Sequence, residues 1–324
     1  MDGIVEGLTA ALRQDAAAIG VIHNVHMTSP SLNDADVHGH IGALWIYPIK
    51  SCAGIAMTRA RLLPTGLEWD RAWMVVDAKG QFLTQRRAAR MALIVPQIDE
   101  AAGLLRITAP GMPALSVSLE LPWMSNALQR RVQVWRSQVM AWDMGDEASQ
   151  WFSQFLGLEC HLVRYDPAQP RYSNTKWTAG IQAPNQFADG YPLLVTTQAA
   201  VDDLNQRLTQ QGHAAVSALR FRPNVVLHGL AAHEEDFIEH LWISAEGGNT
   251  VRLHLGKPCE RCPIPNIDPA TAISHPAVGD TLQQYRQDAR LQGAITFGMN
   301  AVVAQGAGSW LAVGQAAAGA MRFD

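Results

Sequence analysis

Residues 257–270 read KPCERCPIPNIDPA and hold two of the chain's four cysteines, Cys259 and Cys262. Each of the four prolines lacks an N–H group and fixes φ, so we expect neither a helix nor a central strand here. Two thiols and the guanidinium of Arg261 on a stiff loop suit a soft metal and an anionic group carried by that metal. We therefore interpret the rest of the chain as a scaffold for this loop.

The composition is that of a globular protein large enough for two domains. The chain has 324 residues, of which 48% are apolar and 17% charged, against a typical domain of ~150 residues. Its 25 Lys and Arg against 29 Asp and Glu give a net charge of −4, which argues against nonspecific nucleic-acid binding because that requires a basic face.

The sequence also indicates a reduced, cytoplasmic protein. Four cysteines in this length do not make a secreted disulfide framework. No apolar run approaches the ~20 residues of a membrane span. The first forty residues lack the basic and apolar regions of a signal peptide.

Short β segments dominate the pattern of the first half, separated by Gly and Pro, which predicts a small barrel or sandwich. A helix is expected over 146–156, with Asp146 as its N-cap and an apolar stripe that includes Trp151 and Phe155. The strands that we expect in this half are 41–47, 72–76, 81–84, 104–108, 115–119, 132–135, 139–142 and 159–165.

Residues 166–192 show little periodicity and are expected to form a linker or a lid. In the second half, Thr197 is the expected N-cap of a helix over 198–210, and a further helix is expected over 281–289. The end of the chain, rich in Gly and Ala, is expected to fray. The strands predicted here are 193–195, 221–227, 241–244, 251–255, 297–304 and 311–313.

Taken alone, the C-x-x-C spacing has three interpretations. It could be half of a zinc site completed by His254 and His275, a dithiol redox pair, or one metal ligand with a bystander. The prolines after Cys262 leave little room for the helix that usually follows a thioredoxin-like pair.

Other polar residues indicate a pocket for a large anionic ligand. Lys50 and Ser51 follow a strand, and Arg71 lies between two tryptophans. On a strand, Arg222 and Asn224 would point to one face. Thr197 would lie at a helix N-terminus, which favours anions. Each has an ordinary interpretation as a solvated or ion-paired side chain, and only together do they point to a ligand.

Four ordered motifs resemble the MOSC family, named for the C-terminal domain of molybdenum cofactor sulfurase. They are YPIKS at 47–51, DRAW at 70–73, FRPN at 221–224 and CERC at 259–262, the last followed by IDP at 267–269. The resemblance spans about residues 41–303 and is nearest to the mitochondrial amidoxime-reducing component and its bacterial counterparts. It implies an α+β, β-rich fold made of an N-terminal β-barrel-like MOSC domain and a MOSC β-barrel domain with a few helices.

The resemblance also implies a molybdenum cofactor, a pterin dithiolene with a phosphate tail. Cys262 matches the family's thiolate ligand to molybdenum, and soft thiolate ligation suits that metal. Thr197 stands where relatives can carry Ser, and Asn300 stands where the animal relatives have an aromatic residue. The positions that match the family's cofactor contacts are Lys50, Ser51, Arg71, Thr197, Arg222, Asn224, Arg261 and Asn300.

The implied activity is the reduction of small N-hydroxylated substrates, such as amidoximes and hydroxylamines, at molybdenum. No cysteine follows Cys262 and no flavin or nicotinamide fingerprint is present, so we expect electrons from a separate ferredoxin-, flavin- or cytochrome-type protein. The alternatives are a cofactor carrier or sulfur-handling module without turnover, and a zinc-stabilised binding protein.

We expect an N-terminal extension over 1–39, an N-terminal MOSC domain over 40–165, a linker or lid over 166–190, a MOSC domain over 191–316 and a tail over 317–324.

Overall fold

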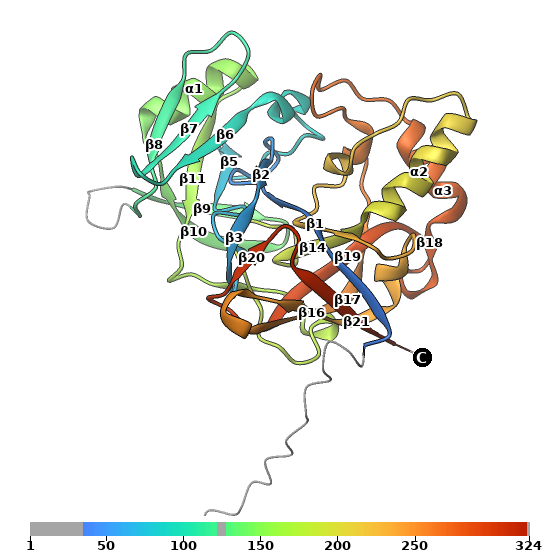
Figure 1. Ribbon diagram of the computed structural model, residues 1–324. Helices are drawn as coiled ribbons and strands as arrows, with labels where there is room; N and C mark the ends of the chain where they lie inside the picture. The colour runs from blue at the N-terminus through green and yellow to red at the C-terminus, as the bar shows by residue number, and fades with distance from the viewer. Residues whose placement is uncertain (1–34, 122–127, 323–324) are drawn as a thin grey trace, which may run out of the picture. The chain divides into compact units, whose positions relative to one another are not determined.

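The computed structural model describes residues 35–121 and 128–322; the predicted extension over 1–39 lies almost wholly outside them. Seven strands close into a barrel, which confirms the β-rich α+β fold (Figure 1). β14 and β15 are parallel, and β19 pairs back to β14 to complete the ring. In order around the barrel the strands are β14 (Leu193–Thr197), β15 (Val225–His228), β1 (Val37–Ile46), β21 (Ala316–Met321), β16 (Ile238–Ser244), β17 (Thr250–Glu260) and β19 (Ala294–Gln305).

Alternating apolar side chains fill the barrel. Val225 and Leu227 of β15 and Leu253 and Leu255 of β17 are fully buried in one cluster. Residues two apart on a strand point to the same face, so each strand gives one face to the barrel interior. The side chains at the alternate positions, where the polar residues can stand, point to the outside of the barrel or lie at its ends.

A second body of structure, from residues of the first half, packs around its own core. Its four-stranded sheet has the order β5 (Trp73–Asp77), β11 (Cys160–Tyr165), β10 (Ser137–Asp143) and β9 (Gln129–Val134). A three-stranded sheet is formed by β6 (Val95–Asp99), β7 (Leu104–Thr108) and β8 (Leu115–Ser118).

Helix α1 (Asp146–Leu156) covers this second core with its aromatic stripe. Trp151, Phe152 and Phe155 are buried against the strands, as the apolar spacing predicts. The N-cap is Gly145 rather than Asp146, and Asp146 is instead the first helical residue. At this position its negative charge still interacts favourably with the helix dipole.

Helices α2 (Gln198–Gln210) and α3 (Ala277–Tyr285) pack together beside the barrel (Figure 1). Leu204 and Leu208 of α2 meet Leu282 of α3 in a cluster that also contains the stacked rings of Phe221 and Phe297. None of the helices among the described residues is long and apolar enough to cross a membrane. The remaining short strands are β2 (Ile55–Met57), β3 (Arg59–Leu63), β4 (Gly66–Leu67), β12 (Arg171–Tyr172), β13 (Pro184–Asn185), β18 (Gln287–Asp288) and β20 (Trp310–Ala312).

Several further expectations from the sequence are wrong. The strand expected over 81–84 is reduced to isolated bridges at Gln81 and Phe82. Strand β17 continues through Pro258. Its pairing with β19 shifts register on either side of this residue, so the ladder does not require the N–H group that proline lacks. The expected frayed end forms β21, a barrel strand between β1 and β16. The strand expected over 221–227 begins only at Val225, and the helix expected over 281–289 ends at Tyr285.

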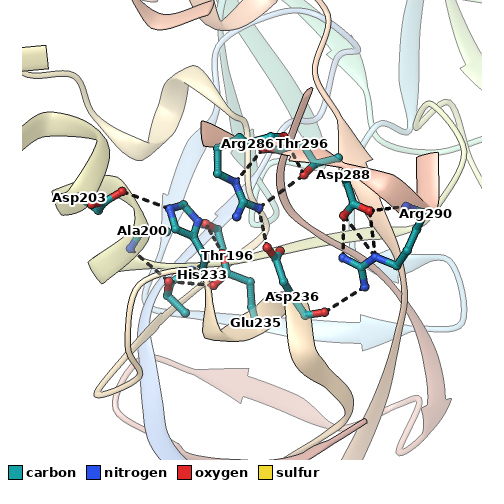
Figure 2. Close-up of polar contacts among 11 residues, drawn as sticks. Thr196, Ala200, Asp203, His233, Glu235, Asp236, Arg286, Asp288, Arg290 and Thr296 are labelled. Atoms are coloured by element: carbon teal, nitrogen blue, oxygen red, sulfur yellow. Dashed lines mark hydrogen bonds and ion pairs between the residues drawn. The ribbon is translucent and has the colours of Figure 1, made fainter. Parts of the chain in front are cut away.

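Thr197 does cap α2, and its hydroxyl also ties the helix to a buried carboxylate. The Thr197 Oγ accepts a hydrogen bond from Ala200 N at 3.2 Å and donates to Glu235 Oε2 at 2.9 Å. The Thr196 hydroxyl donates to Glu235 Oε1 at 3.2 Å (Figure 2). Glu235 lies in the short helix η6 (Glu234–Phe237) and is fully buried.

Among the residues that the structure describes, no cation forms an ion pair with Glu235, and Arg286 pairs with the neighbouring Asp236 (Figure 2). Burial, together with the charge of Asp236, therefore raises the pKa of Glu235 from 4.5 to about 7.

This shift predicts a specific pH dependence of stability. As pH rises from 4.5 to 7, the unfolded chain loses the Glu235 proton while the folded chain retains it, so the free energy of unfolding falls with pH. The total fall is about 3 kcal/mol at 1.36 kcal/mol per pKa unit, and it levels off above pH 7. The side chain in the Glu235→Gln variant is neutral at every pH, so its free energy of unfolding should not show this fall. Urea denaturation at pH 5 and pH 8 measures it, with Glu234→Gln as the control. Parallel pH profiles for wild type and Glu235→Gln would contradict the assignment.

Candidate cofactor-binding site

One cavity gathers every predicted site residue except Thr197. Segments 188–191 and 259–262 line it together with Thr84 and Arg86. The predicted residues that it brings together are Lys50, Ser51, Arg71, Arg222, Asn224, Arg261, Cys262 and Asn300.

The barrel's topology explains this convergence. Strands β1 and β15 are antiparallel, with Leu44 opposite Val225, so the residues after β1 and those before β15 emerge at the same edge. On β19, Asn300 lies opposite Lys257 of β17 and Leu194 of β14. The end of β17, which carries Cys259 and leads into Cys262, therefore reaches the edge to which β1 and β15 bring the basic residues.

Three residues of the cavity wall have left-handed backbone. Ser51, Arg71 and Arg222 have φ values of 68°, 49° and 59°. Such conformations cost about 1–3 kcal/mol each for residues other than glycine and gather at functional sites. The left-handed turn at Arg222 also replaces the strand alternation expected for Arg222 and Asn224, although both side chains still line the cavity.

Two guanidiniums pack against the ring of the buried Tyr47. The Arg71 guanidinium lies 4.3 Å from the ring centroid and that of Arg222 lies 4.2 Å from it. The Arg71 guanidinium donates hydrogen bonds to both carboxylate oxygens of Asp70 at 2.6 and 2.7 Å and to the Arg222 carbonyl oxygen at 3.0 Å. It also donates to the side-chain oxygen of Asn224 at 3.1 Å.

Arg222 keeps one donor unused. Its Nη1 donates to the carbonyl oxygen of Cys52 at 2.6 Å, but its buried Nη2 has no hydrogen-bond partner among the described residues. Burial and the neighbouring charge of Arg71 lower the pKa of Arg222 to about 10, so the side chain still carries its charge at neutral pH. A bound anion would satisfy both the charge and the unpaired N–H group.

Lys50 supplies a third positive charge from a nearly buried position, with 5% of the residue exposed. Its Nζ donates to the carbonyl oxygen of Phe187 at 2.8 Å and pairs with the Asp189 carboxylate. Trp135 donates to the same carboxylate at 2.9 Å. Burial lowers the pKa of Lys50, and the Asp189 charge opposes that shift.

The two cysteines of the loop have different surroundings. Arg261 Nη1 lies 3.1 Å from Cys259 Sγ, and Arg261 Nη2 donates to the carbonyl oxygen of Phe221 at 3.0 Å. Cys262 Sγ takes part in none of the hydrogen bonds found across the described residues. The buried Nε of Arg261 is also unpaired within that part of the chain. Cys262 is therefore the thiol that remains available to a ligand.

The structure does not support a zinc site formed by Cys259, Cys262 and the two nearby histidines. Within residues 35–121 and 128–322, His254 groups with Glu239 and His240 and not with the cysteines. His275 packs edge to face against His213, with 5.4 Å between the ring centroids.

Thr197 does not line the cavity, and its hydroxyl is hydrogen-bonded to Ala200 N and the Glu235 carboxylate. Neither the supporting roles of Tyr47 and Asp70 nor the presence of Asp189 and Arg86 in the cavity wall was predicted from the sequence. Tyr47 and Asp70 stand in the YPIKS and DRAW motifs, so their motif positions were a usable signal. Asp189 and Arg86 carry no signal of that kind.

The residues present fit an anionic, soft-metal cofactor. Within the described part of the chain, two of the cavity's guanidiniums have buried donors without partners, and the Cys262 thiol in the same wall makes no hydrogen bond. Cationic N–H donors suit phosphate, and a thiolate suits a soft transition metal.

Comparison with known proteins agrees with this arrangement. The MOSC N-terminal beta barrel domain matches residues 38–159 and the MOSC domain matches residues 182–317. Mitochondrial amidoxime-reducing component 1 of Mus musculus is 32% identical over 256 residues, which cover 76% of this chain and 72% of that protein. The component 2 protein of Homo sapiens is also 32% identical, with the same coverage.

Molybdenum cofactor sulfurase matches this chain over only part of its own length. Molybdenum cofactor sulfurase of Homo sapiens is 29% identical over 79% of this chain but only 29% of its own length. Among solved structures, the YUAD protein from Bacillus subtilis aligns with a TM-score of 0.34 at 9% identity, over 87% of this chain and 97% of that one. From the two matching domains and the 32% identity, we conclude that the chain belongs to the MOSC-domain family.

Proposed function

We propose that this protein binds one molybdenum cofactor and reduces small N-hydroxylated substrates with electrons from a separate redox protein. The observation that carries the proposal is the gathering of Cys262 with the unpaired donors of Arg222 and Arg261 in one cavity. The amidoxime-reducing relatives support the choice of reaction. The reduced thiols that it requires fit the predicted cytoplasmic setting.

Each group of the cavity has a role in holding the cofactor. Arg222, Arg261 and Lys50 provide charge and N–H donors for its anionic part, and Asn224 fixes Arg71 in place. The Cys262 thiolate would bind molybdenum. When bound, the cofactor supplies a centre that removes the oxygen of an N–OH group with two electrons and two protons, leaving N–H and water.

The wall formed by 188–191 comes from the segment predicted as a linker or lid. Lys50 binds Phe187 and Asp189 of this segment, so the segment is fastened to the first half of the chain. A substrate would enter beside this wall, and the segment would limit the access of water to the site.

A second candidate is a cofactor carrier or sulfur-handling module. The partial match to molybdenum cofactor sulfurase favours it. Turnover with an artificial reductant separates the two functions, because a carrier binds the cofactor but reduces no substrate.

The cysteine assignment predicts unequal effects of two matched substitutions. Cys262→Ser should abolish the reduction of benzamidoxime to benzamidine, because serine is a harder ligand whose proton is far less readily lost. Cys259→Ser should keep most of its molybdenum and much of its activity. Product formation with reduced viologen and molybdenum content per chain measure both effects. Equal losses in the two variants would restore the paired-cysteine interpretations.

Arg222→Gln should weaken cofactor retention without unfolding the protein. Loss of a charge-assisted contact costs roughly 1.5–3 kcal/mol, or about 10–150-fold in affinity. Molybdenum and pterin content after gel filtration measures retention. Arg59→Gln is the matched control, since Arg59 lies on β3 over the Trp310 ring and does not line the cavity. Equal cofactor content in the two variants would remove Arg222 from the binding set.

The electron source should be external. With reduced viologen the loaded protein should convert benzamidoxime, and with NADH alone it should not, because the sequence carries no nicotinamide or flavin fingerprint. Sustained NADH-dependent turnover by the pure protein would reveal a redox centre that the proposal lacks.

A further inference from the structure

Two histidines face each other across neighbouring strands on the outside of the barrel. His240 of β16 is directly opposite His254 of β17, and their ring centroids are 5.4 Å apart. Leu241 and Leu253, one residue along from each, point into the barrel core. Because successive side chains alternate between faces, both imidazoles lie on the outer face.

A β-bulge brings a carboxylate to the same face. The pairing of β16 with β21 shifts register between Ile238 and His240, so Glu239 is an extra residue in the ladder. Ile238 and Leu241 both point into the barrel core although they are three residues apart. Glu239 and His240 therefore both turn outward, which regular alternation would forbid.

The three side chains are spaced as metal ligands. One ligand atom from each of Glu239, His240 and His254 lies within 4.8 Å of the other two. The distance from Glu239 Oε1 to His240 Nε2 is 3.9 Å, too long for a hydrogen bond. Two ligand atoms that each lie about 2.0–2.2 Å from one ion are roughly 3–4 Å apart.

Both imidazoles also have unmet bonding capacity. The Nδ1 atoms of His240 and His254 are buried and have no hydrogen-bond partner among the described residues. His254 is only 5% exposed, so water does not readily supply the missing bond. A buried polar atom without a partner is uncommon and indicates an unseen ion, water or ligand nearby.

Charged side chains near the imidazoles act on a bound cation in opposite directions. Arg252, Arg322 and Glu239 all lie close enough to His240 and His254 to act on them electrostatically. The two arginines repel a cation and therefore limit the affinity, whereas Glu239 supplies the attracting charge.

We propose that Glu239, His240 and His254 form a binding site for a divalent transition-metal ion of the zinc type. None of the three residues lines the cofactor cavity. Two imidazoles and one carboxylate select zinc-type ions over calcium or magnesium, which prefer oxygen ligands. The side chains of His240 and Glu239 are 30% and 45% exposed, so the fourth position of the ion faces solvent. The ion would fasten β16 to β17 beside the bulge.

The test uses the full-length protein, stripped of metal with a chelator and titrated with zinc chloride against a chromophoric competitor. To remove binding by the cysteine pair, the titration uses the Cys259→Ser/Cys262→Ser background. We expect one zinc ion per chain and a zinc-dependent rise of the melting temperature. Absence of zinc binding in this background would overturn the proposal.

Single substitutions then assign the ligands. His240→Asn, His254→Asn and Glu239→Gln should each weaken zinc binding at least about tenfold, since even the outer partners of metal ligands contribute 10–100-fold. Glu239→Gln is exposed and conservative, so it remains informative if His254→Asn fails to fold. Arg252→Gln should tighten binding by removing a repelling charge.

A matched control comes from another pair of neighbouring histidines. The ring centroids of His213 and His275 are also 5.4 Å apart, but these residues are absent from the one metal-type grouping of the described residues. His213→Asn should leave the affinity for zinc unchanged. Unchanged affinity in the Glu239 and His240 variants, or a loss confined to His213→Asn, would overturn the assignment.

Discussion

The buried carboxylate of Asp70 joins the two halves of the cavity wall. It accepts a hydrogen bond from the backbone N–H of Tyr47 at 2.8 Å, and each of its two oxygens accepts one from Arg71 Nη1. Arg71 in turn reaches the carbonyl oxygen of Arg222 and the amide of Asn224, more than 150 positions along the chain. Burial raises the pKa of Asp70 and the Arg71 guanidinium opposes that shift. Without Asp70, Arg71 would remain in the wall with no carboxylate to balance it, and the breaking of such a pair costs several kcal/mol.

The cavity concentrates positive charge in a protein whose net charge is −4. Arg71 and Arg222 both pack against the ring of Tyr47, so their charges are held close together. Like charges at such a distance repel, and burial together with this repulsion lowers the pKa of Arg222. A bound anion relieves it. The left-handed turns at Ser51, Arg71 and Arg222 place the donors before any ligand arrives, which reduces the ordering required on binding.

The local elements were predictable because their signals are local. The stripe of α1 and the Thr197 cap of α2 each depend on residues within a few positions. The basic residues of the cavity were predictable from ordered motifs. Asp189 was not, because its partner Lys50 is 139 positions away.

The other failures arise from sheet pairing. Gly and Ala in β21 carry little strand propensity, yet the close packing of β1 and β16 on either side requires small residues. A Cβ at Gly319 would lie 2.9 Å from side-chain atoms of Val37 and Ile238. The bulge at Glu239 likewise depends on how β16 pairs with β21 and leaves no mark in the sequence.

The position of β1 in the barrel has a consequence for the order of folding. Val37 pairs with Gly319, so β1 finds one of its two barrel neighbours only after the chain has been made 282 positions further. Contacts so distant in sequence form slowly, because a very long loop must close first. The sheet formed by β5, β9, β10 and β11 and the helix α1 draws on residues 73–165 alone. During synthesis that part can assemble first, while the barrel, and with it the complete cavity, waits until β21 has left the ribosome.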